Sequence, residues 1–203
     1  MARIAVLASG VGTNLQALLA DPVVGAKVAL VVSDRPQAPA LERASRAGIQ
    51  SVVIEPSGFE NRGSYDAALV ALLKDEGIDV VVLAGFMRLL SSTFVDAFAG
   101  RILNVHPSLL PAFPGGTSVA DALAWGVKVT GVTVHLVDVE VDHGPIVAQE
   151  SLPVYPDDDW ETLESRVHEV EHRLLPRAVE ALMQGRVKVD GRVVRVLEEE
   201  KNK

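Results

Sequence analysis

Asn104 and His106 are two residues apart in the run Asn104-Val-His-Pro-Ser-Leu-Leu-Pro111. Residues with this spacing project to the same side of an extended strand. An amide beside an imidazole suits a reaction that develops an oxyanion and moves a proton. Asp142, in the turn Asp142-His-Gly-Pro145, could orient the imidazole and favour its charged form. An isolated Asn-x-His pair is more often structural, so this pattern alone does not establish catalysis.

A metal centre is an alternative for the same region. The side chains that could bind a metal ion are His106, His135, Asp142 and His143. No compact ligand motif such as His-Glu-x-x-His accompanies them. We therefore expect no metal.

A second pattern is the glycine-containing stretch Ser9-Gly-Val-Gly-Thr-Asn14, which follows an apolar run and precedes a helical one. Glycines let backbone N–H groups approach an anion, and the start of a helix adds a favourable dipole. The stretch lacks the third glycine of a dinucleotide fingerprint and the lysine of a Walker loop. It predicts a phosphate-binding loop, or else a tight turn that binds nothing.

The third pattern is Leu83-Ala-Gly-Phe-Met-Arg-Leu-Leu90. Gly85 would allow a ligand to approach the backbone closely, and the apolar residues could form the wall of a flat pocket. Taken singly, Phe86, Met87 and Leu90 fit a hydrophobic core better than a pocket.

The elements that must position these residues alternate in the first half of the chain. The expected strands are Ile4–Ala8, Val28–Val32, Val52–Ile54, Val80–Ala84 and Ile102–Val105, and the expected helices are Asn14–Ala20, Pro39–Ala47, Ser64–Glu76 and Ser92–Phe98. Short continuous apolar runs are typical of parallel strands buried on both faces. The alternation predicts an α/β fold with an open, Rossmann-like, doubly wound, mostly parallel sheet.

The second half has a different pattern. A proline- and glycine-rich loop precedes a short helix at Val119–Trp125, and strands are expected at Lys128–Val137 and Ile146–Val154. The short link between these strands predicts an antiparallel pair. A long helix begins at Asp158 or Asp159, reaches about Leu182 and contains Pro176, which should kink it. Asp190-Gly191 predicts a hairpin over Val187–Val196.

Length and composition limit the function. The 203 residues suggest one domain, 1–203, and the formal net charge of −8 disfavours binding to nucleic acid. The chain has no cysteine, which excludes disulfides and thiolate metal sites. The longest apolar run is far shorter than the ~20 residues of a spanning helix, and no signal peptide is apparent. We expect a cytoplasmic protein that does not bind membranes.

Taken together, the motifs resemble the glycinamide ribonucleotide formyltransferase family, the folate-dependent enzymes of purine synthesis. The matching stretches are Ser9–Gln16, Leu83–Leu90, Asn104–Pro111, Gly131–His135, Asp142–Pro145 and Arg166–Pro176. The likeness covers nearly the whole chain. It implies formyl transfer from 10-formyltetrahydrofolate, the co-substrate, to the amine of glycinamide ribonucleotide, with no metal required. Residues 1–100 would form a phosphate-binding half, and residues 101–203 a catalytic and folate-binding half.

The resemblance also assigns residues. The catalytic ones are Asn104, His106 and Asp142. Those that bind the phosphate and ribose are Gly10, Val11, Gly12, Thr13, Asn14, Glu171 and, by a softer match, Arg62. Those that bind folate are Met87, Arg88, Leu89, Leu90, Val95, Ile102, Asn104, Val137, Asp138 and Asp142.

Two positions depart from the family pattern. Thr117 stands where the family usually has a histidine, and His168 where a lysine is common. The first change could alter substrate positioning or proton handling. The second would weaken a cationic contact with the ribose part of the substrate.

Other functions stay open. A 10-formyltetrahydrofolate hydrolase shares the catalytic residues but normally has an N-terminal regulatory domain, for which the early phosphate loop leaves no room. Methionyl-tRNA formyltransferase adds a C-terminal domain, and the negative charge argues against tRNA. A formyltransferase for another amine and a non-catalytic nucleotide-binding module are further alternatives. The expected partners are small molecules, and a homodimer is compatible with the sequence.

Overall fold

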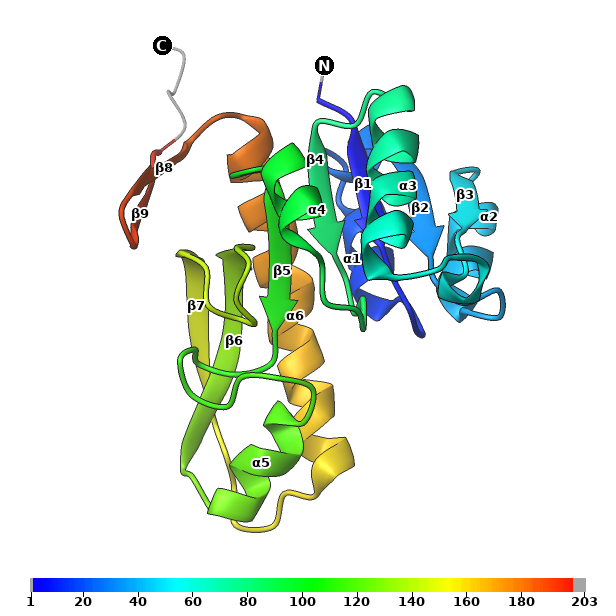
Figure 1. Ribbon diagram of the computed structural model, residues 1–203. Helices are drawn as coiled ribbons and strands as arrows, with labels where there is room; N and C mark the ends of the chain where they lie inside the picture. The colour runs from blue at the N-terminus through cyan, green and yellow to red at the C-terminus, as the bar shows by residue number, and fades with distance from the viewer. Residues whose placement is uncertain (1, 199–203) are drawn as a thin grey trace.

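A seven-stranded sheet in the order β3-β2-β1-β4-β5-β6-β7 forms the centre of the computed structural model, which describes residues 2–198 (Figure 1). The strands are β1 (Ile4–Leu7), β2 (Val28–Ser33), β3 (Gln50–Val53), β4 (Val80–Leu83), β5 (Ile102–His106), β6 (Val129–Leu136) and β7 (Ile146–Pro153). The first five are parallel, β6 is antiparallel to β5, and β7 is antiparallel to β6. The predicted open, doubly wound, mostly parallel sheet is confirmed.

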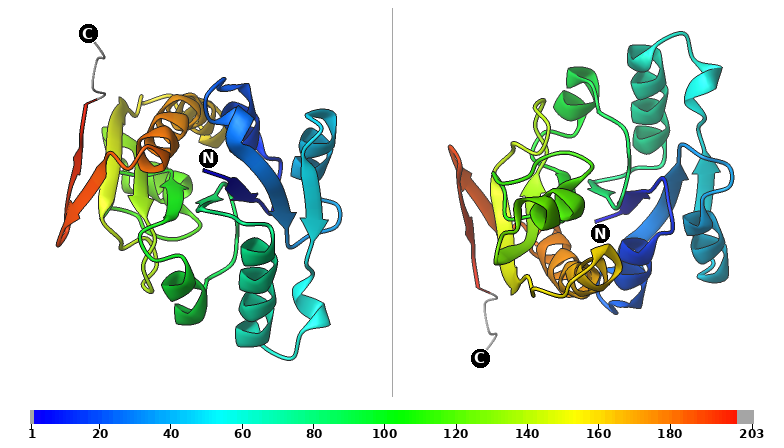
Figure 2. Two further views of the ribbon diagram at one scale, coloured as in Figure 1. Left: turned by 90° about the horizontal axis from the view of Figure 1, so that it is seen from above. Right: turned by 90° about the horizontal axis from the view of Figure 1, so that it is seen from below.

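Helices cover both faces of the sheet, which explains the continuous apolar runs of its strands (Figure 2). The helices are α1 (Thr13–Ala20), α2 (Pro39–Arg46), α3 (Arg62–Asp75), α4 (Ser92–Ala97), α5 (Ser118–Trp125) and α6 (Trp160–Met183), with short 3₁₀ turns at Gly25–Lys27 and Pro56–Gly58. Ile4 and Val6 of β1 pack in the cluster shared by α1, α2, α5 and α6. Ala5 and Leu7 pack in the other cluster, with α3 and α4.

The same alternation places the candidate catalytic residues on one face. Leu103 and Val105 of β5 pack on the α6 side of the sheet, whereas Ile102 packs on the α3 and α4 side. Asn104 and His106 share the side of Ile102, because side chains alternate along a strand. In the antiparallel register, Asn104 lies opposite His135 and His106 lies opposite Thr133. Because β6 pairs with β5 in the antiparallel direction, His135 lies on the same face as Asn104.

One strand differs from its prediction. We expected Val52–Ile54 to be buried on both faces, but β3 begins at Gln50 and most of its side chains are exposed. The reason is its position: β3 ends the strand order, and among residues 2–198 it pairs with β2 alone. An edge strand has one open side and needs less apolar surface than a central strand.

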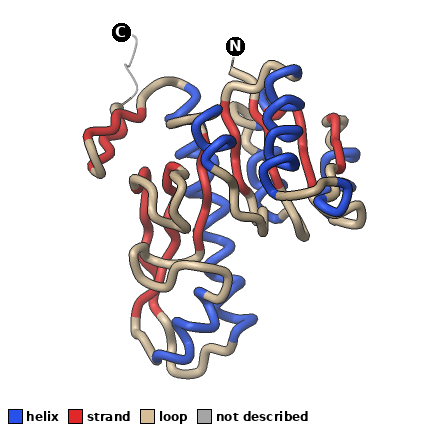
Figure 3. Tube along the Cα trace, viewed as in Figure 1, coloured by secondary structure: helices blue, strands red, loops and turns tan. Residues whose placement is uncertain are grey.

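The C-terminal elements follow the predictions closely. Asp159 caps α6 with its side chain, and the helix continues through the buried Pro176 as far as Met183. The hairpin β8 (Val187–Asp190) and β9 (Val193–Val196) forms a separate two-stranded sheet. Figure 3 shows this hairpin as a strand pair apart from the main sheet. Within residues 2–198, no helix combines the length and the apolar character needed to cross a membrane.

The α3–α4 side of the core depends on Phe94. Its side chain is 0% exposed, and its ring lies 5.5 Å from that of Phe98. We predict that Phe94→Ala lowers the free energy of unfolding by about 3–5 kcal/mol, because truncation loses apolar burial and leaves a cavity. Urea titration followed by circular dichroism measures this loss. Trp125→Ala is the control, since Trp125 is 79% exposed and its truncation should change stability by only about 0.5 kcal/mol. Equal losses in the two variants would contradict the assigned core.

Candidate active site

The candidate site lies where the chain connections from neighbouring strands diverge. β1 and β4 are adjacent, but the chain continues from β1 toward β2 and from β4 toward β5. Open α/β sheets bind ligands in the crevice at this point, outside the carboxyl ends of the strands. The loops after the two strands are joined there, because the Ser9 amide donates to the Gly85 carbonyl at 3.0 Å and the Met87 amide donates to Ser9 Oγ at 2.9 Å.

The loop before α1 leaves its backbone accessible to a ligand. Gly12 has φ +77°, and an added Cβ would lie 2.8 Å from Ala40 Cβ, so a larger residue would collide with α2. Arg43 of α2 donates to the Val11 carbonyl at 2.9 Å. Gly12 is also the N-cap of α1 and provides no side-chain cap. The first N–H groups of the helix are therefore suited to an anionic group.

Asn14 and Glu171 form a buried pair between α1 and α6. Asn14 Nδ2 donates to Glu171 Oε2 at 2.9 Å, and both residues are buried. Burial raises the pKa of Glu171, although the Asn14 hydrogen bond and nearby His168 both act to lower it. Asn14 Oδ1 is buried and has no hydrogen-bond partner. The structure thus brings together two residues that the sequence predicted for substrate binding from opposite ends of the chain.

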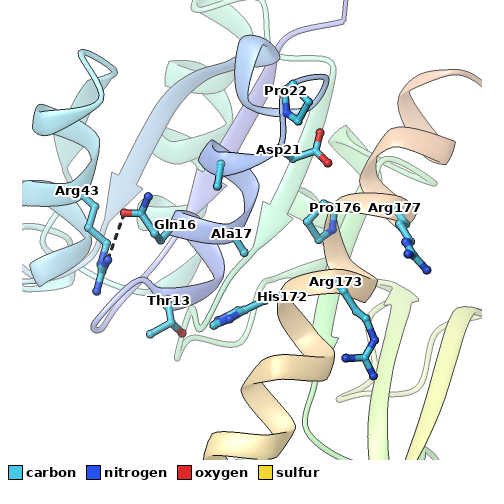
Figure 4. A pocket seen from close by; sticks show the side chains of 11 residues that line it. Thr13, Gln16, Ala17, Asp21, Pro22, Arg43, His172, Arg173, Pro176 and Arg177 are labelled. Atoms are coloured by element: carbon cyan, nitrogen blue, oxygen red, sulfur yellow. Dashed lines mark hydrogen bonds between the residues drawn. The ribbon is translucent and has the colours of Figure 1, made fainter.

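A cavity of about 640 Å³ extends from this region between α1 and α6 (Figure 4). Thr13, Arg43, His172, Arg173 and Arg177 are among its lining residues. His172 points from α6 toward Thr13. Its ring stacks on that of His168, with centroids 5.9 Å apart, and His168 Nε2 lies 3.8 Å from Glu171 Oε2. At residue 168, where the family pattern commonly has a lysine, the structure therefore places a second imidazole next to the Asn14–Glu171 pair.

Asn104 is held by two neighbours on the α3–α4 side of the sheet. Its Nδ2 donates to His135 Nε2 at 3.1 Å and to Asp142 Oδ1 at 3.3 Å. His135 Nδ1 donates to the Leu136 carbonyl at 2.8 Å, which leaves Nε2 as the acceptor in the neutral ring. For Asn104 to donate to a substrate oxyanion, its longer bond, to Asp142, has to be exchanged.

His106 lies between a carboxylate and a carbonyl. Its Nδ1 is 3.4 Å from Asp142 Oδ2, and its Nε2 donates to the Phe113 carbonyl at 2.8 Å, with Ser118 Oγ 3.0 Å away. Burial lowers the pKa of His106 more than the Phe113 carbonyl and Asp142 raise it. We expected Asp142 to favour the charged ring. Asp142 does act in that direction, but the loss of hydration on burial outweighs the carboxylate, so the net shift of the His106 pKa is downward.

Asp142 is ionised in this setting. Burial acts to raise its pKa, but contacts with His135, the Gly115 amide and His106 together hold the pKa below its usual value. The Gly115 amide donates to Oδ2 at 2.8 Å. The backbone of Asp142 has φ +50°, which is unfavourable for a residue with a Cβ. Such a conformation persists only where surrounding contacts maintain it.

The loop between β5 and α5 packs against β6. Thr133 Oγ1 donates to the Ser108 carbonyl at 2.7 Å and accepts from the Leu110 amide at 3.1 Å. Thr117, which stands in the place of the family histidine, is exposed and donates instead to Asp121 Oδ2 at 2.8 Å. The adjacent Ser118 is buried and reaches His106. The position that departs from the pattern thus points away from the catalytic candidates.

The residues predicted for folate binding fall into two groups. Met87 and Leu89 are 65% and 57% exposed. Val139 and Val141, which lie in the same loop as Asp138 and Asp142, are also exposed. Ile102 and Val95 are buried in the core, and Leu90 and Val137 pack partly against it. The Arg88 guanidinium lies 4.9 Å from the Tyr65 ring centre. The exposed members can contact a flat ligand directly, whereas the buried ones can shape its pocket only from beneath.

Two sets of predicted residues are not brought together. Arg62 begins α3 and is exposed, with no bond to the catalytic candidates among the described residues. His143 of the metal alternative turns away, with Nδ1 donating to Asp138 Oδ2 at 2.8 Å. In residues 2–198, no group of three or more histidine, aspartate and glutamate side chains is arranged to hold a metal ion.

Comparison with known proteins shows the family of the chain. Residues 2–179 match the family model described as formyl transferase. A phosphoribosylglycinamide formyltransferase of Mycobacterium tuberculosis is 49% identical over 194 residues, covering 94% of this chain and 89% of the relative. The chain belongs to the formyl transferase family. The crystal structure of glycinamide ribonucleotide transformylase 1 from Symbiobacterium toebii superposes with a TM-score of 0.95 at 48% identity, covering 98% and 95% of the two chains.

Some relatives in this family are much longer. The trifunctional purine biosynthetic protein adenosine-3 of Drosophila melanogaster is 47% identical over 188 residues, but the chain spans 14% of its length. The similarity therefore concerns one part of that protein.

Sequence reasoning missed three members of the site. The sequence predicted no role for His135 beyond the metal alternative and the family match, and no role for Ser118. Gly115 acts through its backbone N–H, which residue type does not reveal. The strand alternation at His135 was visible, but its pairing with Asn104 required the register of β5 and β6. Ser118 and Gly115 come from an irregular loop, where spacing does not predict position.

The buried Glu171 carboxyl predicts a pH effect on stability. Because its pKa is raised above the usual 4.5, the folded state holds a proton that the unfolded state releases as the pH rises. Wild-type stability should therefore fall relative to Glu171→Gln from about pH 4.5 toward neutral, since glutamine still accepts from Asn14. Chemical denaturation between pH 4 and 8 measures the difference. Glu169→Gln, at an exposed position on the same helix, controls for the lost charge. A difference that stays constant with pH would contradict the buried carboxyl.

Proposed function

We propose that the pocket around Asn104, His106 and Asp142 transfers the formyl group from 10-formyltetrahydrofolate to the amine of glycinamide ribonucleotide. The products are formylglycinamide ribonucleotide and tetrahydrofolate, as required for purine synthesis. The observation that supports this most directly is the combination of a phosphate-type loop with the Asn104–His106–Asp142 cluster at one sheet edge, in a chain that covers 89% of a phosphoribosylglycinamide formyltransferase.

In this proposal each substrate has its own loop. The ribonucleotide phosphate binds the N–H groups of Thr13 and its neighbours, and the ribose lies toward Glu171. The folate lies against the exposed apolar surface that includes Met87 and Leu89. Holding both substrates in contact removes much of the entropic barrier to the reaction. Ser9 bonds to the folate loop through Met87 and Gly85, so the two binding regions have a fixed relative position.

We assign the proton transfer to His106. The neutral amine attacks the formyl carbon, a C–N bond forms, and the carbonyl oxygen becomes an oxyanion. The lowered pKa makes His106 neutral near pH 7. Because Nε2 carries the proton that is donated to the Phe113 carbonyl, the atom that can accept the proton released by the amine is Nδ1, which lies 3.4 Å from Asp142 Oδ2. Asp142 and the Phe113 carbonyl then stabilise the imidazolium. The same proton passes to N10 of the folate as the C–N10 bond breaks, so no net proton is gained or lost.

We assign stabilisation of the oxyanion to Asn104. Its Nδ2 already contacts His135 and Asp142, so its direction is fixed before the substrate binds. A preorganised donor of this kind can contribute about 3 kcal/mol to catalysis. The exchange of the 3.3 Å bond to Asp142 for a bond to the oxyanion is the least costly route, because the shorter bond to His135 is kept.

The alternatives differ in what they leave unexplained. A hydrolase would need neither the uncapped start of α1 nor the Asn14–Glu171 pair, and the names of the full-length relatives do not favour it. A formyltransferase for a different phosphorylated amine would use the same loop. We also propose that residues 1–203 form one domain, with a phosphate-binding half (1–100) and a catalytic and folate-binding half (101–203), and that the protein is cytoplasmic.

The decisive test measures turnover of 10-formyltetrahydrofolate with and without glycinamide ribonucleotide in metal-free buffer. We expect conversion only when both substrates are present. His106→Ala should lower kcat by about 100-fold or more, because it removes the group that moves the proton.

Asn104→Ala, measured beside it, should lower kcat by a similar factor while the KM for the ribonucleotide changes little. Folate loss without the ribonucleotide would support the hydrolase instead. Absence of conversion under both conditions would overturn the proposed activity.

The lowered pKa of His106 predicts the pH profile. Because the neutral ring is the base, kcat/KM should fall as the pH drops through an ionisation below the usual 6.5 of histidine. Asp142 raises this pKa, so Asp142→Asn should move the inflection to lower pH while reducing the rate. The ionisation of the substrate amine is common to both enzymes and cancels in the comparison. An inflection that moves to higher pH in Asp142→Asn would contradict the assignment.

A further inference from the structure

The loop that contains Asp142 is attached to the C-terminal hairpin. This loop, residues 137–145, joins β6 to β7. Arg192 lies in the turn between β8 and β9, 49 residues from His143 along the chain. Its NH1 lies 3.1 Å from His143 Nε2, and its NH2 donates to the His143 carbonyl at 2.6 Å. One guanidinium thus binds both the ring and the backbone of the residue next to Asp142.

The direction of each hydrogen bond follows from the chemistry of arginine. A guanidinium only donates, so His143 Nε2 must accept and the ring proton must lie on Nδ1. That proton is donated to Asp138 Oδ2 at 2.8 Å. Asp138 Oδ1 in turn accepts from the Glu140 amide at 3.0 Å. Arg192, His143 and Asp138 therefore form a continuous series of contacts along the outer side of the loop.

The inner side of the same loop is held by the catalytic candidates. Asp142 contacts Gly115, His106 and Asn104 there, with its backbone at φ +50°. Most residues with a Cβ avoid that conformation, and aspartate adopts it more readily than they do, so the surrounding contacts have only a small cost to offset. The contacts of Asp142 provide the inner constraint, and Arg192 provides one on the outside. The planar fork of arginine suits this role, because two donors in a fixed arrangement set orientation as well as position.

We propose that Arg192 is a positioning residue for the formyl transfer reaction, acting through His143 to hold Asp142 and the folate-binding loop. This inference rests on the proposed function. It extends the active site to a hairpin that lies apart from the main sheet (Figure 3). Residues 10–14 and Glu171, on the opposite part of the crevice, have no share in these contacts, so binding of the ribonucleotide should not depend on Arg192.

The test compares Arg192→Ala with Arg195→Ala, a control that removes an exposed arginine from the same hairpin. For Arg192→Ala we expect a higher KM for the folate co-substrate and a lower kcat, each by roughly 5-fold or more, while the KM for glycinamide ribonucleotide stays within about 2-fold. Arg195→Ala should match the wild type. Arg192→Lys should recover part of the loss, because an ammonium group can still donate to the His143 carbonyl.

A second measurement does not require turnover. Amide hydrogen exchange read by mass spectrometry should be faster over residues 137–145 in Arg192→Ala and unchanged over residues 10–14. His143→Ala should give a smaller change in the same direction, because it removes the ring contacts but keeps the carbonyl that accepts from Arg192. The double variant should be no worse than Arg192→Ala, because both changes act on one series of contacts. Unchanged exchange in the loop, or an equal rise in both KM values, would overturn the proposal. An inactive wild-type enzyme with the expected exchange pattern would overturn the proposed function alone.

Discussion

One carboxylate contacts three successive segments of the chain. Asp142 contacts Asn104 and His106 on β5, Gly115 in the loop that follows β5, and, at 3.7 Å, His135 on β6. Asp142 is partly buried, and an ionised carboxylate in such a place is stable only when hydrogen-bond donors, here the Gly115 amide and Asn104 Nδ2, replace its lost hydration. The need to satisfy this group therefore determines where the loop after β5 lies and how the loop after β6 returns. It also explains why Asp142 keeps a backbone conformation that its side chain disfavours.

A similar constraint governs the other half of the crevice. Ser9 bonds to the loop after β4 through both its amide and its hydroxyl, while Asn14 reaches across to Glu171 on α6. The first contact links the loops after β1 and β4, and the second links helices from opposite ends of the chain. The proposed catalytic cluster and the proposed phosphate loop therefore keep their relative position without any single rigid element that spans them.

Much of this arrangement was predictable, and the reasons are physical. Short apolar runs between helical stretches indicate the parallel sheet, since few folds bury such strands on both faces. The proximity of Asn14 and Glu171 came from family resemblance, because nothing in local spacing relates positions on α1 and α6. The net effect on His106 was not predictable, because the balance between burial and Asp142 depends on how completely the loop covers the ring. The contact of Arg192 with His143 also required coordinates, since it depends on where an independent hairpin comes to rest.

The two edges of the sheet differ in their exposure to other chains. β3 ends the sheet on one side with four residues, mostly exposed and including the polar Gln50 and Ser51. A short polar edge is a poor template for another strand. On the other side, β7 is longer, and the β8–β9 hairpin lies beside it (Figure 2). Because the hairpin forms a separate sheet, it does not pair with β7, but it occupies space that another chain would need to reach that edge. Displacement of the β8–β9 hairpin would therefore make aggregation through β7 easier.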